Sequence, residues 1–189
     1  LRLLIFDSGR LGQIINLSTT EMNVGTATLS LMPGEYQLWA VANATESNID
    51  ASLGCELSDV KLKFAKSGDF YSGTSDFWTG TTTLSVTSGG VNRATVALER
   101  RVAKVKVTVS DIPEEVQNIY MRVAGTPTNV TITGTKQGTK SDVGAEMNFN
   151  AIEGVALGEV LLFPAESADL NIYYEIGGVI RMGTIRIDT

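Results

Sequence analysis

The residue types that most often carry enzyme chemistry are scarce in this chain of 189 residues. It has no histidine, so it lacks the most common general base and the usual partner of serine and cysteine nucleophiles. Its one cysteine, Cys55, can form neither an intrachain disulfide nor a multi-cysteine zinc site. We therefore expect Cys55 to be a small buried hydrophobe.

No pattern in the sequence predicts a cofactor or a metal ion. The glycine-rich stretches lack the spacing and the lysine of a phosphate-binding loop, and no acidic loop has the calcium-binding pattern. The carboxylates that a glycosidase would need in pairs fall in predicted turns and strand ends, where solvated surface charge is the simpler interpretation. We predict no catalytic residue, no cofactor and no metal site, and hence a protein that is not an enzyme.

One aromatic cluster has the residue types of a ligand platform. Phe70, Tyr71, Phe77 and Trp78 lie in a stretch rich in glycine, serine and aspartate. Aromatic rings exposed on loops can stack against sugar rings, which gives a glycan platform as one interpretation. In the other interpretation, which we favour, Phe77 and Trp78 lead into a strand and cap the first half of the fold.

Charge and composition exclude several classes of protein. The chain has 15 basic and 21 acidic residues, and its formal net charge of -6 disfavours nucleic acid as a partner. A hydrophobic fraction of 43% with 19% charged residues indicates a folded globular protein. No stretch approaches the roughly 18 to 20 consecutive apolar residues of a membrane-spanning helix.

The elements that must position these residues are strands. Apolar residues alternate with a period of two through most of the chain, and glycine-rich or proline-containing turns separate the runs. About seven short strands in each half predict an all-β fold of two antiparallel β-sandwiches. The predicted strands include residues 27–31, 35–42, 60–64, 81–87, 118–125, 129–135, 146–152, 159–164, 168–176 and 179–188.

The longest extended run, residues 93–109, is too long for one strand of a compact sheet. Its apolar residues occupy even positions up to Leu98 and odd positions from Ala103, so the buried face changes between them. This phase change predicts two domains, residues 1–100 and 101–189. Arg100 and Arg101 stand at the change, and we expect their guanidinium groups to lie at the interdomain junction, where arginine's five donors suit bridging contacts.

Two runs are candidate edges for pairing with another chain. The opening run has apolar residues on both faces, including Leu3 and Ile5, and the closing run changes phase at Gly183, before Ile185 and Ile187. A strand with an exposed edge can pair with a strand of a second protein. In the other interpretation, which we favour, both runs are core strands of the monomer.

The order of these motifs resembles the fimbrillin-A-associated anchor family (FimB-like) of gram-negative type V pili. The resemblance rests on the segment Phe77-Trp78-Thr79-Gly80, which has a tryptophan inserted before the glycine, and on the stretch "LERRVAKVKV" from Leu98 to Val107. Further matching pieces follow the same order along the chain: residues 1–9, 31–43 and 161–178.

The resemblance implies two tandem transthyretin-like Greek-key β-sandwiches and a structural subunit at the base of a fimbrium. Such a subunit would tether the fibre to the gram-negative outer membrane and would bind a fimbrial subunit by β-strand addition. Family members resemble lipoproteins, so membrane attachment would come from a lipid anchor outside this segment, and we expect the true N-terminus to lie upstream. The alternative is a surface glycan-binding lipoprotein that uses the aromatic loop 70–78.

Overall fold

The computed structural model describes residues 1–67 and 70–188. Strands and their connections make up almost all of this part of the chain, and nearly all strand pairs are antiparallel, so the predicted all-β fold is confirmed. The chain forms two compact units. Unit 1 comprises Leu1–Leu62, Asp76–Arg101 and Thr131–Thr135, and unit 2 comprises Lys63–Ser75, Val102–Val130 and Lys136–Thr189.

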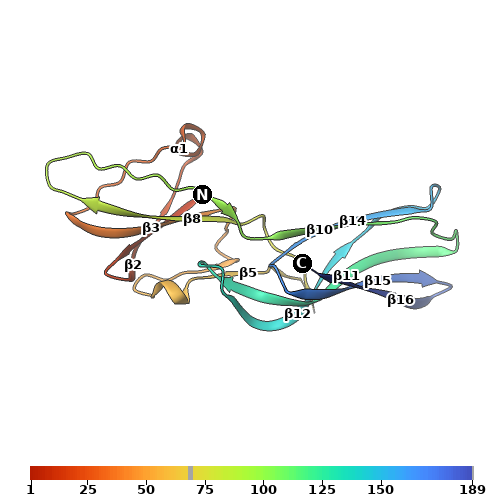
Figure 1. Cartoon of the computed structure of the whole chain (residues 1–189). Helices are drawn as coiled ribbons and strands as arrows, with labels where there is room; N and C mark the ends of the chain where they lie inside the picture. Colours follow the sequence, from red (N-terminus) through yellow and green to blue (C-terminus); the bar gives the residue numbers. More distant parts are fainter. Residues whose placement is uncertain (68–69, 189) are drawn as a thin grey trace. The chain divides into compact units, whose positions relative to one another are not determined.

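Unit 1 is built on one five-stranded antiparallel sheet with the order β2-β1-β3-β8-β9. Its strands are β1 (Arg2–Asp7), β2 (Arg10–Asn16), β3 (Gly34–Ala42), β8 (Trp78–Val86) and β9 (Glu99–Arg100). The short strands β4 (Ile49–Asp50) and β5 (Lys61–Lys63) pair with each other, and the 3-10 helix η1 (Leu57–Asp59) lies between them in sequence. Figure 1 shows β5 on one side of the sheet and helix α1 (Thr19–Val24) on the other.

The core of unit 1 includes side chains on both faces of its central strands. In β1 the residues Leu4, Ile5 and Phe6 are fully buried, and β3 contributes Leu38 and Val41. Because other elements of unit 1 lie on both sides of this sheet (Figure 1), consecutive apolar residues of β1 can be buried on opposite faces.

Unit 2 contains two sheets. The larger has the order β16-β15-β11-β12-β7-β6, in which only the β7–β12 pair is parallel. Its strands are β6 (Lys66–Ser67), β7 (Phe70–Tyr71), β11 (Val116–Thr131), β12 (Lys136–Glu146), β15 (Ser167–Ile176) and β16 (Val179–Asp188). The smaller sheet has the order β10-β14-β13, with β10 (Ala103–Val109), β13 (Asn148–Asn150) and β14 (Val155–Leu162).

The two sheets of unit 2 face each other. A Cβ atom added to Gly158 of β14 would lie 3.0 Å from the Met121 sulfur of β11, so these strands pack closely across the core. Met121 is fully buried, as are Val123 of β11 and Leu162 of β14. Figure 1 likewise shows β10 and β14 on one side of β11, β15 and β16, which is the arrangement of a β-sandwich.

Two predicted strands are wrong. Residues 27–31 and 93–98 belong to no strand, although apolar residues alternate in both. In the first segment Ala27, Leu29 and Leu31 are half-buried while the residues between them are exposed. Alternation therefore reports burial on one side of an extended chain, which does not require hydrogen bonding to a neighbouring strand.

Two smaller expectations also need correction. Cys55 is only half-buried and lies in a loop. Its backbone carbonyl accepts a hydrogen bond from the Leu11 amide. Helix α1 was not predicted, although Ser18 and Glu21 form a capping box at its start. The serine-to-glutamate spacing of that motif is visible in the sequence.

Candidate functional site

The segment before β8 and the segment that forms β9 meet at one end of the unit 1 sheet. Trp78 pairs with Arg100 and Thr79 pairs with Glu99 in the β8–β9 ladder. The Arg101 amide donates a hydrogen bond to the Phe77 carbonyl at 2.8 Å, which extends the pairing by one residue. The two motifs that carry the family resemblance are thus neighbours in space.

The two arginines of the second motif bind one side chain of the first motif, Thr79, and one directly before it, Asp76. The Arg100 Nε donates to the Asp76 carboxylate at 2.6 Å, and the Arg101 Nε donates to the Thr79 hydroxyl at the same distance. Thr79 is fully buried, whereas Asp76 and Arg100 are about one-third exposed. Arg101 also lies 3.4 Å from the exposed Glu99 carboxylate.

Gly80 allows the extended segment 93–98 to cross β8. A Cβ atom at this position would collide with the Ala97 carbonyl and lie 2.9 Å from a methyl group of Val96. Only glycine leaves room for a backbone at that distance. The glycine of the Phe77-Trp78-Thr79-Gly80 motif therefore has a packing role that its sequence context alone did not reveal.

These contacts place Arg100 and Arg101 within unit 1. The residues they bind, Asp76, Thr79 and Glu99, belong to the same unit, and the next residue along the chain, Val102, begins a segment of unit 2. The two arginines therefore secure the end of the segment Asp76–Arg101 of unit 1, at the point where the chain enters unit 2. Their bridging role between domains stays a prediction.

The predicted aromatic residues are divided between the two units. Phe77 is fully buried in unit 1, and the neighbouring Trp78 is about one-third exposed. Tyr71 belongs to unit 2, where its ring centroid lies 5.7 Å from that of Phe64. The side chain of Phe70 lies outside the described residues. Burial of Phe77 leaves its ring no free face for a sugar.

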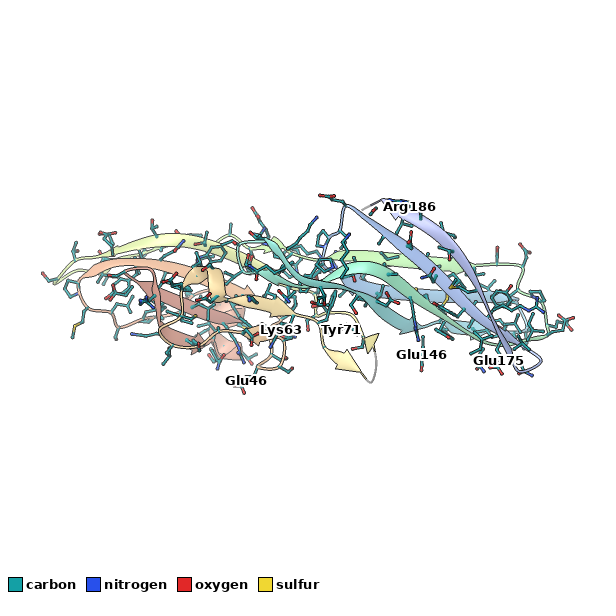
Figure 2. The ribbon with its side chains drawn as sticks, turned by 90° about the horizontal axis from the view of Figure 1, so that it is seen from below. Glu46, Lys63, Tyr71, Glu146, Glu175 and Arg186 are labelled. Carbon is teal, nitrogen blue, oxygen red and sulfur yellow. The ribbon has the colours of Figure 1, made fainter. Side chains whose placement is uncertain are left out.

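The two candidate pairing edges differ in their surroundings. Strand β1 lies between β2 and β3, so Leu3 and Ile5 are at no free sheet edge. Strand β16 pairs only with β15 among the described strands, which leaves its second edge free. Strands β15 and β16 form a hairpin. In Figure 2, Glu175 lies near the turn of this hairpin and Arg186 lies toward its other end.

Large apolar side chains on β16 are exposed on both faces of the strand. The exposed fractions are 56% for Val179, 61% for Ile180, 54% for Met182 and 58% for Ile185. Ile187 is half-buried. Val179, Ile180 and Met182 were not among the predicted site residues, because the apolar run "VIRM" is visible in the sequence but its exposure is not.

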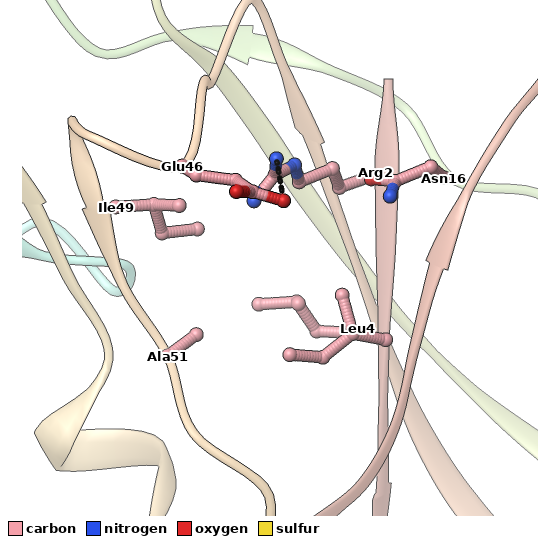
Figure 3. Close-up of a pocket in the computed structure, with 7 residues that line it drawn as sticks. Arg2, Leu4, Asn16, Glu46, Ile49 and Ala51 are labelled. Carbon is pink, nitrogen blue, oxygen red and sulfur yellow. Dashed lines mark ion pairs between the residues drawn. The ribbon is translucent and has the colours of Figure 1, made fainter.

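A cavity of about 290 Å³ opens beside β1 and β2. Leu4, Ile14, Ile49 and Ala51 give it an apolar lining, and the Arg2 guanidinium lies 3.8 Å from the Glu46 carboxylate at its rim (Figure 3). Nothing in this lining pairs a nucleophile with a base. In the part of the chain that the structure describes, three or more metal-binding side chains nowhere gather into a possible metal site.

Comparison with known proteins defines the family. The family model of the fimbrillin-A associated anchor proteins Mfa1 and Mfa2 matches residues 1–181. This chain belongs to that family, whose members are structural proteins of fimbriae at the cell surface and not enzymes. None of the curated protein sequences matches the chain.

Solved structures share the fold at low sequence identity. A candidate adhesin from Bacteroides ovatus has a TM-score of 0.70 and 13% identity, over 98% of this chain and 75% of that one. The fimbrial anchor protein Mfa2 from Porphyromonas gingivalis has a TM-score of 0.61 and 13% identity, over 99% of this chain and 71% of that one. At such identities the likeness establishes the fold alone.

Proposed function

We propose that this chain is the anchor that tethers a fimbrium to the outer membrane of a gram-negative bacterium and that it binds a fimbrial subunit by β-strand addition. Family membership supports the fimbrial role. Attachment to the membrane would come from a lipid anchor outside this segment. Within the described residues, no helix has the length and apolar character needed to span a membrane.

The free edge of β16 is the observation that carries strand addition. A long edge strand with unpaired backbone groups is a template for a strand of another chain. β16 has ten residues, and four of its large apolar side chains are more than half exposed. An added strand would satisfy the free amide and carbonyl groups and cover these side chains, which is how β-augmentation provides affinity and register.

We also propose that the chain acts as two domains, residues 1–100 and 101–189, joined at Arg100 and Arg101. The contacts of both arginines with Asp76 and Thr79 support this, because they hold the end of the first segment in place. A rigid attachment at that point would limit the freedom of the chain that enters the second domain.

The test of the proposed function is co-purification with the major fimbrial subunit of the source bacterium. We expect the full chain to retain the subunit and the double variant Ile180→Lys/Ile185→Lys to retain about tenfold less, because it places charge on both faces of β16. Ile152→Lys is the matched control, since Ile152 is 98% exposed in a turn of unit 2. Equal retention by both variants would contradict binding at β16.

A further inference from the structure

The two sheets of unit 2 differ in width. The smaller sheet has three strands in the order β10-β14-β13, and the larger has six in the order β16-β15-β11-β12-β7-β6. Since Gly158 of β14 packs on Met121 of β11, the middle of the smaller sheet lies over the middle of the larger one. Neighbouring strands are about 4.8 Å apart, so three strands cannot cover six.

One side of this sandwich is closed by the segment that follows β7. Tyr71 of β7 pairs with Val143 of β12 in the larger sheet, and the Thr74 amide donates to the Leu161 carbonyl of β14 in the smaller sheet at 3.1 Å. Strand β10 occupies the other edge of β14 along the whole of Ala156–Leu162. The Thr74 amide therefore binds the edge of β14 that also pairs with β13, and β10 pairs with the opposite edge of β14. Since β7 and β15 lie on opposite sides of β11 and β12 in the larger sheet, β10 lies on the side of β15 and β16.

On the β10 side of the sandwich, the inward-facing side chains are less buried than in the middle of the two sheets. In the smaller sheet, the inward residues Val160 and Leu162 of β14 are buried, whereas the inward residues of β10 are only half-buried. These β10 residues are Ala103, Val105, Val107 and Val109. In the larger sheet, Leu170 of β15 is 5% exposed, whereas Ile185, its partner on β16, is 58% exposed.

We infer that the free edge of β10 accepts one further strand, contributed by the fimbrial partner, which covers the inner face of β15 and β16. This inference rests on the proposed function, and it places a second pairing edge in unit 2. Among the described strands, β10 pairs only with β14, so its other edge is unpaired. An added strand would extend the smaller sheet over the side chains that are now half-buried or exposed.

Two lysines on the outer face of β10 predict the charge of the added strand. Lys104 lies 2.9 Å from the Glu159 carboxylate, while the Lys106 side chain is 72% exposed and lies 3.9 Å from the same carboxylate. An acidic residue on the added strand, opposite Lys106, would form a favourable cross-strand pair. The partner strand should thus carry aliphatic residues inward and at least one acidic residue outward.

The same lysines disfavour pairing with a second copy of this chain in the registers centred on Lys104, Val105 or Lys106. Two β10 strands paired antiparallel about Val105 would place Lys104 of each copy opposite Lys106 of the other on the outer face. Opposed like charges destabilise a strand pair. The edge is therefore better matched to a different, acidic strand.

A photo-crosslinking amino acid at Thr108, which is exposed on β10, tests this inference in the full-length protein bound to fimbriae. We expect mass spectrometry to identify a crosslinked peptide of the fimbrial subunit that contains an acidic residue. A crosslink only to this protein's own chain, or none while the subunit still co-purifies, would overturn the β10 assignment and leave the proposed function intact. Failure of the unmodified protein to bind the subunit would overturn both.

A charge reversal gives a second readout. Lys106→Glu should weaken retention of the subunit about five- to tenfold, because an attractive cross-strand pair becomes a repulsive one. Lys140→Glu is the matched control, since Lys140 is an exposed lysine on β12 of the same unit. Retention that is unchanged by Lys106→Glu, or weakened equally by both variants, would contradict recognition at β10.

Discussion

The guanidinium of Arg100 binds the carboxylate of Asp76 at 2.6 Å, which joins two segments separated by 24 residues of sequence. Both side chains are about one-third exposed, and such surface pairs contribute at most about 1 kcal/mol to stability. The adjacent bond from Arg101 reaches the fully buried Thr79 hydroxyl. Neighbouring arginines thus have different energetic roles.

Alanine substitution should separate these roles. Arg101→Ala should lower the free energy of unfolding by about 1 to 3 kcal/mol, because it leaves a buried hydroxyl without its donor. Arg100→Ala should cost less than about 1 kcal/mol. Urea denaturation measures both, with the exposed Arg93→Ala as the control. A larger loss for Arg100→Ala than for Arg101→Ala would contradict this account.

Small-angle scattering addresses the proposed junction between domains. If Arg100 and Arg101 fix the point where the chain passes from one domain to the next, the double alanine variant should show a changed distribution of interatomic distances. Arg93→Ala should leave the distribution unchanged. Identical scattering from the double variant and the unmodified protein would contradict a role of the two arginines at the junction and leave them only their contacts within unit 1.

Gly80 provides a packing prediction. Gly80→Ala should destabilise unit 1 by about 2 to 3 kcal/mol, because the new methyl group would collide with the Ala97 backbone. Gly12→Ala is the control, since a Cβ at Gly12 would meet only the Ile5 carbonyl, at an ordinary contact distance of 3.6 Å. Equal melting temperatures for the two variants would show that segment 93–98 does not cross β8 as described.

The carboxyl group of Glu159 gives a prediction about pH. The hydrogen bond from Lys104, together with the attraction of its charge, holds the Glu159 pKa below its ordinary value. Because the folded-state pKa is lowered, the stabilising effect is present above the unfolded-state pKa and is lost as pH falls through the folded-state pKa. Lys104→Met should raise the Glu159 pKa in an NMR titration, and Lys140→Met should not. An unchanged pKa in Lys104→Met would exclude this pairing in solution.

The sequence predicted the strands with regular alternation and clear turns. Residues 35–42 and 103–109 form strands as expected, because each pairs with a neighbouring strand. Residues 27–31 show the same alternation without a partner, which a single sequence does not reveal. Strand β11 runs through Gly125, whose φ of +84° accompanies a register shift, where a break between two strands was predicted.

The candidate site was only partly predictable. The phase change near residue 100 drew attention to Arg100 and Arg101, yet their partners depend on tertiary contacts with residues more than twenty positions away. The exposure of β16 depends on its position at the edge of a sheet, which alternation does not encode. The same limit hid the free edge of β10, because the unequal width of the two sheets appears only in the folded unit.

Deletion of the gene tests the central claim most directly, with electron microscopy of the cells and of the culture medium. If this protein anchors fimbriae, the deletion strain should release its fibres into the medium or carry fibres of altered length, and the unmodified gene should restore attachment. The Ile180→Lys/Ile185→Lys gene should restore it poorly. Deleted cells that keep attached fimbriae of normal length would contradict the anchor function.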